Sequence, residues 1–391
     1  MIDFEFVSPT KLFFGKKKEE EIGRIISNYG FSSVFIVYGG GHIVSNGLYQ
    51  RVISRLDEAG IKHEEAHGVR ANPTREFVLA AREKLRAVHP DLILAIGGGS
   101  VIDTAKSLAV SYEYGGDPFD FNLKKVVPTK ALPIGVILTH ASAGSEASNS
   151  CVIQNDETKI KAGFNSDLVR PLFAIENPEL TYSVSAYQTA CGVSDIMMHS
   201  LERFFDPSSP DLLADDWALD LVKNTMKWGA IAVKEPNNYE ARAAVMLNST
   251  LSHNGLTHLG KPFGFVVHPL EHALSGYAPN IVHGAGVALL YPAWASYVVN
   301  VDSSKFAYLT KRIFEIEGTN EKETAIIGIN KMKEYFSSLG MPTSFQEAGL
   351  GEKDIPALVA LASGNGTRAI GCYPQSLQER DIERIYRSLL S

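Results

Sequence analysis

Five side chains in the second half of this 391-residue chain have the types and spacing of a metal site. Asp195 and His199 lie four residues apart in a segment with helical character, so both project from one face of a helix. His268 and His272 repeat this spacing, and His283 follows in a His-Gly-Ala-Gly sequence. Carboxylate oxygens and imidazole nitrogens suit Fe²⁺, Zn²⁺ and similar divalent ions. The spacing therefore predicts that these residues converge on a metal.

Each of these pairs also has a simpler explanation, and one pair has a competing chemistry. An isolated Asp-x-x-x-His is more often a surface or capping pair than a ligand pair. Residues 268–272 match H-x-x-E-H, the inverted zincin pattern, in which two histidines bind zinc and the glutamate acts as a base. A metalloprotease would need a third ligand from another helix. It would also leave Asp195, His199 and the glycine-rich turns unexplained.

A glycine-rich turn follows a strongly apolar segment in the first half of the chain. Leu92–Ile96 is predicted as a buried strand that runs into Gly97-Gly98-Gly99 and then into a helix that Ser100 is expected to cap. Glycines let backbone N–H groups approach phosphate oxygens, and a helix N-terminus adds partial positive charge. An ordinary strand–helix turn would look similar, although three glycines after a strand favour a phosphate site.

Two further segments are expected beside this turn. Gly39-Gly40-Gly41 follows the predicted strand 33–38, and residues 139–145 follow the predicted strand 132–139. In a doubly wound sheet, ligands bind beyond the carboxyl ends of the strands, so the three segments could together cradle a dinucleotide. None of them is a G-x-G-x-x-G or Walker sequence, so neither the ordinary Rossmann fingerprint nor ATP binding is indicated.

The elements that must position these residues differ between the two halves. In the first half, strands over 33–38, 62–67, 92–96 and 132–139 alternate with helices over 46–59, 74–88 and from 100 onward. This alternation predicts a parallel sheet with helices on both faces. Later segments are almost entirely helical: 186–205, 211–233, 239–253, 283–299 and at least two helices within 306–339. We predict an α/β dinucleotide-binding domain over 1–178 and a helical metal-binding domain over 179–391.

The bulk properties exclude several classes of partner. A net charge of −7 argues against nucleic acid or an anionic membrane. Cys151, Cys191 and Cys372 are odd in number and far apart, which implies no disulfide framework and fits a reducing compartment. The first residues do not resemble a signal peptide, and no apolar run is long enough to span a bilayer. We expect a cytoplasmic protein.

In combination, these segments resemble the iron-containing (group III) alcohol dehydrogenase family, and they look closest to its butanol dehydrogenase-like branch. The resemblance covers nearly the whole chain. It rests on Gly97-Gly98-Gly99-Ser100 with Asp103 and Lys106, on Gly144-Ser145-Glu146, on Asp195 with His199, and on His268, Glu271-His272 and His283-Gly284. It implies a dehydroquinate synthase-like architecture: an N-terminal α/β dinucleotide-binding domain with a parallel sheet, an all-helical C-terminal domain, and a metal between them. It also implies a homodimer.

Carried over by position, the resemblance assigns roles to individual residues. It implies that Asp195, His199, His268 and His283 bind the metal, and that His272 lies beside the nicotinamide as a catalytic residue. The residues implied to bind the cofactor are Gly39, Gly40, Gly97, Gly98, Gly99, Ser100, Asp103, Thr139, Ser142 and Lys161. Lys161 could equally be a solvated charge. The family favours Fe²⁺, although the ligand types suit Zn²⁺ as well.

The expected activity is reversible hydride transfer between NAD(P)(H) and small primary alcohols or aldehydes, with His272 passing the proton. An acidic side chain after the strand 33–38 would bind the ribose 2′-hydroxyl of NAD, but Gly39-Gly40-Gly41-His42 contains none. This segment leaves room for a 2′-phosphate. We therefore expect a modest preference for NADP(H), with NAD(H) also accepted.

Several rival functions share parts of this pattern. A lyase similar to dehydroquinate synthase would use NAD without net redox change, but that family usually shows a Glu/His/His metal set instead of one Asp and three His. A glycerol dehydrogenase-like enzyme would have the same fold. A metalloprotease would use no nicotinamide, and a protein that only binds ligands would not need a complete ligand set.

Overall fold

In the computed structural model, which describes residues 1–208, 212–262 and 264–390, the chain divides into two units with different architectures. Ser8–Ser183 form an α/β unit. Met1–Val7 and the chain from Val184 onward form a helical unit. This confirms the predicted fold class, an α/β part with a parallel sheet followed by a helical part.

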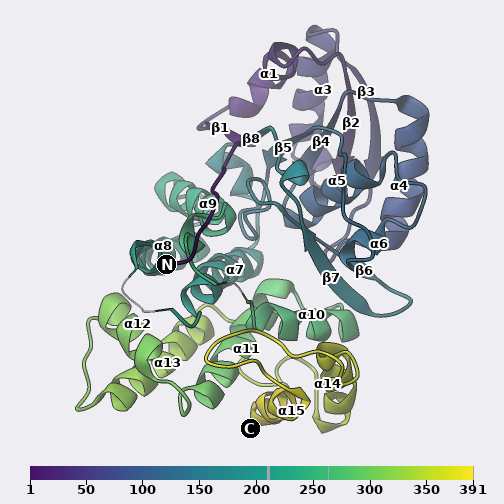
Figure 1. Ribbon diagram of the computed structural model, residues 1–391. Helices are drawn as coiled ribbons and strands as arrows, with labels where there is room; N and C mark the ends of the chain where they lie inside the picture. The colour runs from purple at the N-terminus through teal and green to yellow at the C-terminus, as the bar shows by residue number, and fades with distance from the viewer. Residues whose placement is uncertain (209–211, 263, 391) are drawn as a thin grey trace. The chain divides into compact units, whose positions relative to one another are not determined.

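The α/β unit is built on a six-stranded parallel sheet with the strand order β1-β8-β5-β4-β2-β3 (Figure 1). The strands are β1 Lys11–Phe14, β2 Ser33–Tyr38, β3 Lys62–His67, β4 Leu92–Gly97, β5 Ile134–Leu138 and β8 Phe173–Glu176. All six residues of β4 are buried. A parallel strand covered on both faces needs a continuous apolar run, which is why Leu92–Ile96 could be identified from the sequence.

The direction of strand addition changes between β2 and β4. The chain passes from β2 to β3 on one side and from β4 to β5 on the other, while β2 and β4 pair with each other. Ligands of open parallel sheets bind beyond the carboxyl ends of the strands at such a switch point. Gly39-Gly40-Gly41 and Gly97-Gly98-Gly99 follow these two strands, so the topology brings the two glycine-rich turns to the same place.

Helices and a separate hairpin complete this unit. The helices are α1 Ile22–Asn28, α2 His42–Ser45, α3 Leu48–Glu58, α4 Arg75–Val88, α5 Gly99–Ser111 and α6 Phe119–Asn122. Thr74 caps α4 by accepting a hydrogen bond from the backbone N–H of Phe77. The antiparallel pair β6 Ser150–Asn155 and β7 Ile160–Asn165 was not predicted, and neither were β1 and β8.

In its described part, the second unit consists of helices joined by turns and loops, and its only β-structure is one isolated bridge between Ile370 and Leu377. Its helices are α7 Ala186–Phe204, α8 Leu213–Lys234, α9 Tyr239–His253, α10 Val267–Tyr277, α11 His283–Val298, α12 Ser304–Phe314, α13 Glu321–Ser338, α14 Ile355–Ser363 and α15 Glu379–Arg387. α7 is buried at every position from Thr189 to Phe204. Asp211, where the sequence predicted the start of α8, lies outside the described residues.

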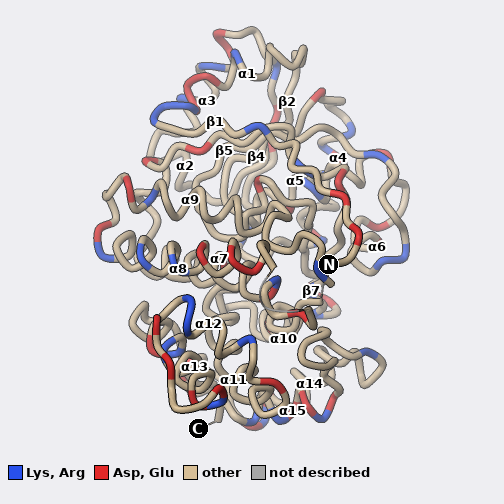
Figure 2. Tube along the Cα trace, turned by 60° about the vertical axis from the view of Figure 1, so that its left-hand side comes forward, with Lys and Arg blue, Asp and Glu red and all other residues tan. Residues whose placement is uncertain are grey.

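Positions of basic and acidic residues are interspersed along the chain, as along α12 and α13 (Figure 2). Among the described residues, none of the helices is both long enough and apolar enough to cross a membrane.

Four charged side chains are nevertheless buried together in the helical unit. Lys261 Nζ lies 2.7 Å from Asp206 Oδ2 and also contacts Asp215, and Lys305 Nζ lies 3.2 Å from Asp206 Oδ2. Each of the four side chains is at most 2% exposed. The cluster joins the end of α7 to the starts of α8 and α12.

We predict that Lys261→Met will lower the free energy of unfolding by about 3–5 kcal/mol, because it leaves two buried carboxylates with one ammonium. The matched control is Lys311→Met, which removes an exposed ion pair with Glu317 and should change stability by less than about 0.5 kcal/mol. Urea unfolding followed by circular dichroism measures both. If the two variants lost the same free energy of unfolding, the prediction that breaking the buried cluster costs more than breaking an exposed ion pair would be wrong.

Candidate metal and dinucleotide sites

Asp195 faces three histidine nitrogens in the helical unit. Its Oδ1 atom lies 3.4 Å from His199 Nδ1, 3.5 Å from His268 Nε2 and 3.6 Å from His283 Nε2. Two ligand atoms that are each about 2.1 Å from one tetrahedral ion lie about 3.4 Å apart. Helices α7 and α10 bring Asp195, His199 and His268 together as one group whose ligand atoms all lie within 4.8 Å of one another. His283, the first residue of α11, directs its Nε2 atom to the same oxygen of Asp195.

The burial of these atoms also fits a cation. Asp195, His199 and His268 are only 3–4% exposed. Asp195 Oδ1, His199 Nδ1 and His268 Nε2 have no hydrogen-bond partner among the described residues. Buried polar atoms without a partner are rare. One divalent ion among them would satisfy all three atoms.

Two of the histidines are held from behind by buried carboxylates. His268 Nδ1 is hydrogen bonded to Glu202, which also accepts from the backbone N–H of His268 at 3.0 Å. His283 Nδ1 is hydrogen bonded to Glu271. Such partners orient the ring of a metal-binding histidine and fix its tautomer. Glu202 was not predicted, although it follows His199 by three residues on the same helix and this spacing could have revealed it.

The position of Glu271 bears on the metalloprotease alternative. Its side chain is fully buried, and its two oxygens contact His283 Nδ1 and Ser275 Oγ. A carboxylate bound in this way supports a neighbouring histidine and is not directed toward a substrate as a general base. The geometry therefore disfavours the H-x-x-E-H protease interpretation.

The electrostatics of the histidines differ. Burial lowers the pKa of His268, but Glu202 and Asp195 outweigh burial and raise it to about 9. This shift reports a negative potential that would attract a cation. Burial, with His253 and His268 beside it, lowers the pKa of His199 well below its usual range. The neutral imidazole that results is the form that binds metals.

Close helix packing maintains this arrangement. A Cβ atom at Gly284 would lie 2.0 Å from the carbonyl oxygen of Cys191, and one at Gly286 would lie 2.8 Å from Cγ of Glu271. Helix α11 can therefore approach α7 and α10 only because these two positions are glycine.

His272 lies beside the ligand set. Its ring centroid is 5.9 Å from that of His283 and 6.5 Å from that of His268. Glu271, His272 and His283 also offer three ligand atoms within 4.8 Å of one another. Because Glu271 already contacts His283 Nδ1 and Ser275, we regard the set around Asp195 as the better metal site.

In the α/β unit, the segments predicted to cradle a dinucleotide lie side by side. The backbone N–H of Thr139 donates to the carbonyl of Gly97 at 3.1 Å. A Cβ atom at Gly98 would lie 3.0 Å from Cβ of His140, so the turn after β4 can approach the segment after β5 only with glycine there. The backbone N–H of Gly68 donates to Gly39 and brings the loop after β3 to the turn after β2.

The expectation that Ser100 caps α5 is wrong. α5 begins at Gly99, and Gly98 occupies the N-cap position without a side-chain hydrogen bond. Ser100 lies within the first turn, and its carbonyl accepts from Thr104 Oγ1 at 2.8 Å. The backbone N–H of Val101 donates to the carbonyl of Gly98 at 3.0 Å. The groups that a phosphate would meet at this helix start are therefore the backbone N–H groups of Gly99 and Ser100 and the Ser100 hydroxyl.

Asp103 and Lys106 hold the segment that leads into the hairpin. Asp103 accepts from Ser145 Oγ at 2.6 Å and from the backbone N–H of Val152 at 2.9 Å. Lys106 is fully buried and donates to the carbonyls of Ser148 and Ser150, and burial lowers its pKa to about 8. These contacts give both residues a structural function in shaping the loop after β5.

Lys161 on β7 is also buried, at 9% exposed, and its Nζ donates to Oδ1 of Asn72 at 3.1 Å. Asn72 lies in the loop after β3 with a positive φ of 55°. Pro73 of that loop accepts from the backbone N–H of Gln154 on β6. The sequence did not indicate Asn72 as a site residue, because its partner is 89 positions away.

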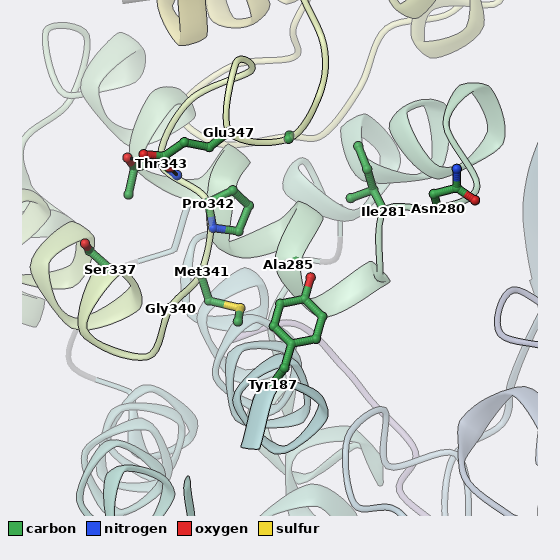
Figure 3. Close-up of a pocket in the computed structure, with 11 residues that line it drawn as sticks. Tyr187, Asn280, Ile281, Ala285, Ser337, Gly340, Met341, Pro342, Thr343 and Glu347 are labelled. Carbon is green, nitrogen blue, oxygen red and sulfur yellow. Dashed lines mark hydrogen bonds between the residues drawn. The ribbon is translucent and has the colours of Figure 1, made fainter. Parts of the chain in front are cut away.

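A pocket of about 550 Å³ lies elsewhere in the helical unit (Figure 3). It is lined by the start of α7, the turn before α11 and the segment after α13, including Tyr187, Ile281 and Met341. Among the described residues that line it, none is a predicted site residue.

Comparisons with known proteins match both units to one family. Residues 9–178 match the family described as "Iron-containing alcohol dehydrogenase", and residues 189–390 match "Fe-containing alcohol dehydrogenase family, C-terminal". NADH-dependent butanol dehydrogenase A of Clostridium acetobutylicum is 39% identical over 99% of both chains. The NADPH-dependent aldehyde reductase YqhD of Escherichia coli is 29% identical over 95% of each chain. The crystal structure of NADH-dependent butanol dehydrogenase A from Thermotoga maritima superposes with a TM-score of 0.96 at 34% identity, covering 100% of this chain and 99% of that one.

We predict that Asn72→Gly will be more stable than Asn72→Ala by about 1–2 kcal/mol, because alanine opposes a positive φ and glycine does not. Both variants lose the hydrogen-bond acceptor for Lys161. The difference between their free energies of unfolding therefore reports the cost of the positive φ at position 72 alone. Asn72→Asp keeps an acceptor and should lie nearest the wild type. Urea midpoints measure the series, and equal midpoints for the glycine and alanine variants would contradict the strained conformation.

Proposed function

Since the chain belongs to the iron-containing alcohol dehydrogenase family and is an NAD(P)-dependent alcohol or aldehyde oxidoreductase, we propose that it interconverts small primary alcohols and aldehydes at a single metal site. Asp195, His199, His268 and His283 are the proposed ligands. The observation that carries the assignment is the set of three distances of 3.4–3.6 Å around Asp195 Oδ1. Fe²⁺ is the proposed metal, and Zn²⁺ suits the same ligands.

The chain's own residues would bind, orient and exchange a proton. When bound, the ion supplies Lewis-acid polarisation of the substrate oxygen, and the nicotinamide carries the hydride. Glu202 and Glu271 keep the rings of His268 and His283 directed at Asp195. His272 gives a proton to the substrate oxygen in reduction and accepts it in oxidation, since an imidazole titrates near neutral pH.

The nucleotide would be held by the edge of the sheet. Gly98, Gly99 and Ser100 bind the pyrophosphate at the N-terminus of α5, where backbone N–H groups and the helix dipole favour an anion. Thr139 and Ser142 line the nucleotide, Lys161 binds the ribose, and Gly39, Gly40, Gly97 and Asp103 shape the surrounding turns.

The proposal predicts that His268→Ala will lose most of its bound metal and nearly all turnover. Elemental analysis measures the metal, and loss of reduced-nicotinamide absorbance with butanal measures turnover. His63→Ala, which changes a β3 histidine outside the predicted sites, is the control and should keep both. Full metal content in His268→Ala would sink the ligand assignment, and an inactive wild type would sink the proposed reaction.

His272→Ala should behave differently from His268→Ala. We expect it to keep its metal while turnover falls by about 10²–10⁴-fold, the range of general acid–base contributions, with a changed pH profile. Elemental analysis and pH–rate measurements on one preparation separate the two effects. If this variant loses metal as readily as His268→Ala, the assigned role is wrong.

The proposed cofactor preference is NADP(H), by a modest margin. Its support is the absence of a carboxylate among Gly39, Gly40, Gly41 and His42, all of which are described residues. His42 Nε2 is hydrogen bonded to Ser183 Oγ at 2.7 Å, which holds this imidazole next to the turn. NAD(H) should also be accepted.

Gly40 offers a clean test of this preference, since a Cβ atom there would meet nothing within 4 Å. Gly40→Asp should shift kcat/KM toward NADH, because its charge penalises only the phosphorylated ribose, whereas Gly40→Ala should leave the ratio near that of the wild type. A tenfold wild-type preference for NADH, about 1.4 kcal/mol, would overturn the proposal.

We further propose that the enzyme is a homodimer. The N-terminal segment supports this, since its apolar side chains Met1, Ile2, Phe4 and Phe6 are 42–82% exposed and could be covered in a protein interface. Light scattering measures the mass directly.

The functional division at residues 178/179 stays a prediction. A cytoplasmic location also stays a prediction, and it is supported by the three cysteines, which are all described and all free thiols.

A further inference from the structure

The three histidines around Asp195 are not supported in the same way. His268 and His283 each have an Nδ1 atom bonded to a buried glutamate. His199 has no such carboxylate among the described residues, and its Nδ1 atom is the one that faces Asp195. An imidazole that rotates about its Cβ–Cγ bond would turn this nitrogen away from Asp195, so something else must restrict the ring.

The ring of His199 lies against the ring of His253, the last residue of α9. The two centroids are 4.1 Å apart and the planes differ by 30°, which is a stacked arrangement. On another side, the ring of His268 lies 4.5 Å from His199. His253 does not belong to either group of described side chains whose ligand atoms lie within 4.8 Å of one another. It therefore contacts a ligand and lies outside the ligand set.

We infer that His253 is a positioning residue that fixes the plane of His199 by ring stacking, the task that Glu202 and Glu271 perform for the other two histidines. This inference rests on the proposed function, because it takes His199 as a metal ligand. The relevant property is the flat ring at position 253, since two stacked rings make contact over their whole faces and a turn of one ring would break that contact. An aromatic replacement should preserve the effect, and an aliphatic one of similar size should not.

The test compares His253→Phe, which keeps a ring, with His253→Leu, which keeps bulk alone. Leu247→Ala is the control, because Leu247 is an exposed residue of the same helix. Each protein is loaded with Co²⁺ and mixed with excess EDTA, and the visible absorption of the bound ion reports its release. Supporting contacts of metal ligands typically change affinity by 10- to 100-fold. We expect release about tenfold faster from His253→Leu, and within about twofold of the wild type from His253→Phe and Leu247→Ala.

Two results would overturn the inference: release from His253→Leu at the wild-type rate, or release from His253→Phe as fast as from His253→Leu. If circular dichroism shows that His253→Leu does not fold, His253→Met replaces it with the same expectation, since it also lacks a planar group. Failure of the proposed function looks different. In that case the wild type itself would bind no stoichiometric Co²⁺, and His268→Ala would not differ from it.

Discussion

A buried carboxylate that faces three imidazole nitrogens is the constraint on which the helical unit depends. An uncompensated charge at the position of Asp195 would cost several kcal/mol, and Glu202 and Glu271 add two more buried acids behind His268 and His283. The ion proposed between Asp195 and the imidazoles would offset that cost. Its binding would then be coupled to the folding of α7, α10 and α11 around this point.

The same constraint explains why α7 is buried along most of its length. The helix carries two proposed ligands, Asp195 and His199, then the supporting acid Glu202, and it ends at the buried charge cluster around Asp206. These polar residues need hydrogen-bond and ion-pair partners on several neighbouring helices, because one neighbouring helix could not provide all of these partners. A helix with such requirements lies in the interior of its unit.

Much of the architecture could be predicted because the strongest patterns are local. β2 and β4 are continuous apolar runs, and α9 follows a helical period that ends at His253. β1 and β8 were missed because four-residue strands are too short to show a pattern, and β7 because it is polar and contains Gly163. In the site, i to i+4 spacing indicated Asp195 with His199 and His268 with His272, and the resemblance to a family supplied the proposed ligand set, with His283 included and His272 left out. The contacts of His253 and Asn72 join distant segments, and only the folded chain brings them together.

The close packing at Gly284 and Gly286 has a consequence for the evolution of this fold. Positions 284 and 286 are fixed by the separation of three helices, and this restriction persists whether or not a metal is bound at the neighbouring histidine. His283, the proposed ligand, could therefore change in evolution while the Gly-x-Gly spacing is kept by the helix packing. A chain of the same fold that keeps this spacing but lacks the histidine would retain the packing and could acquire chemistry that needs no metal.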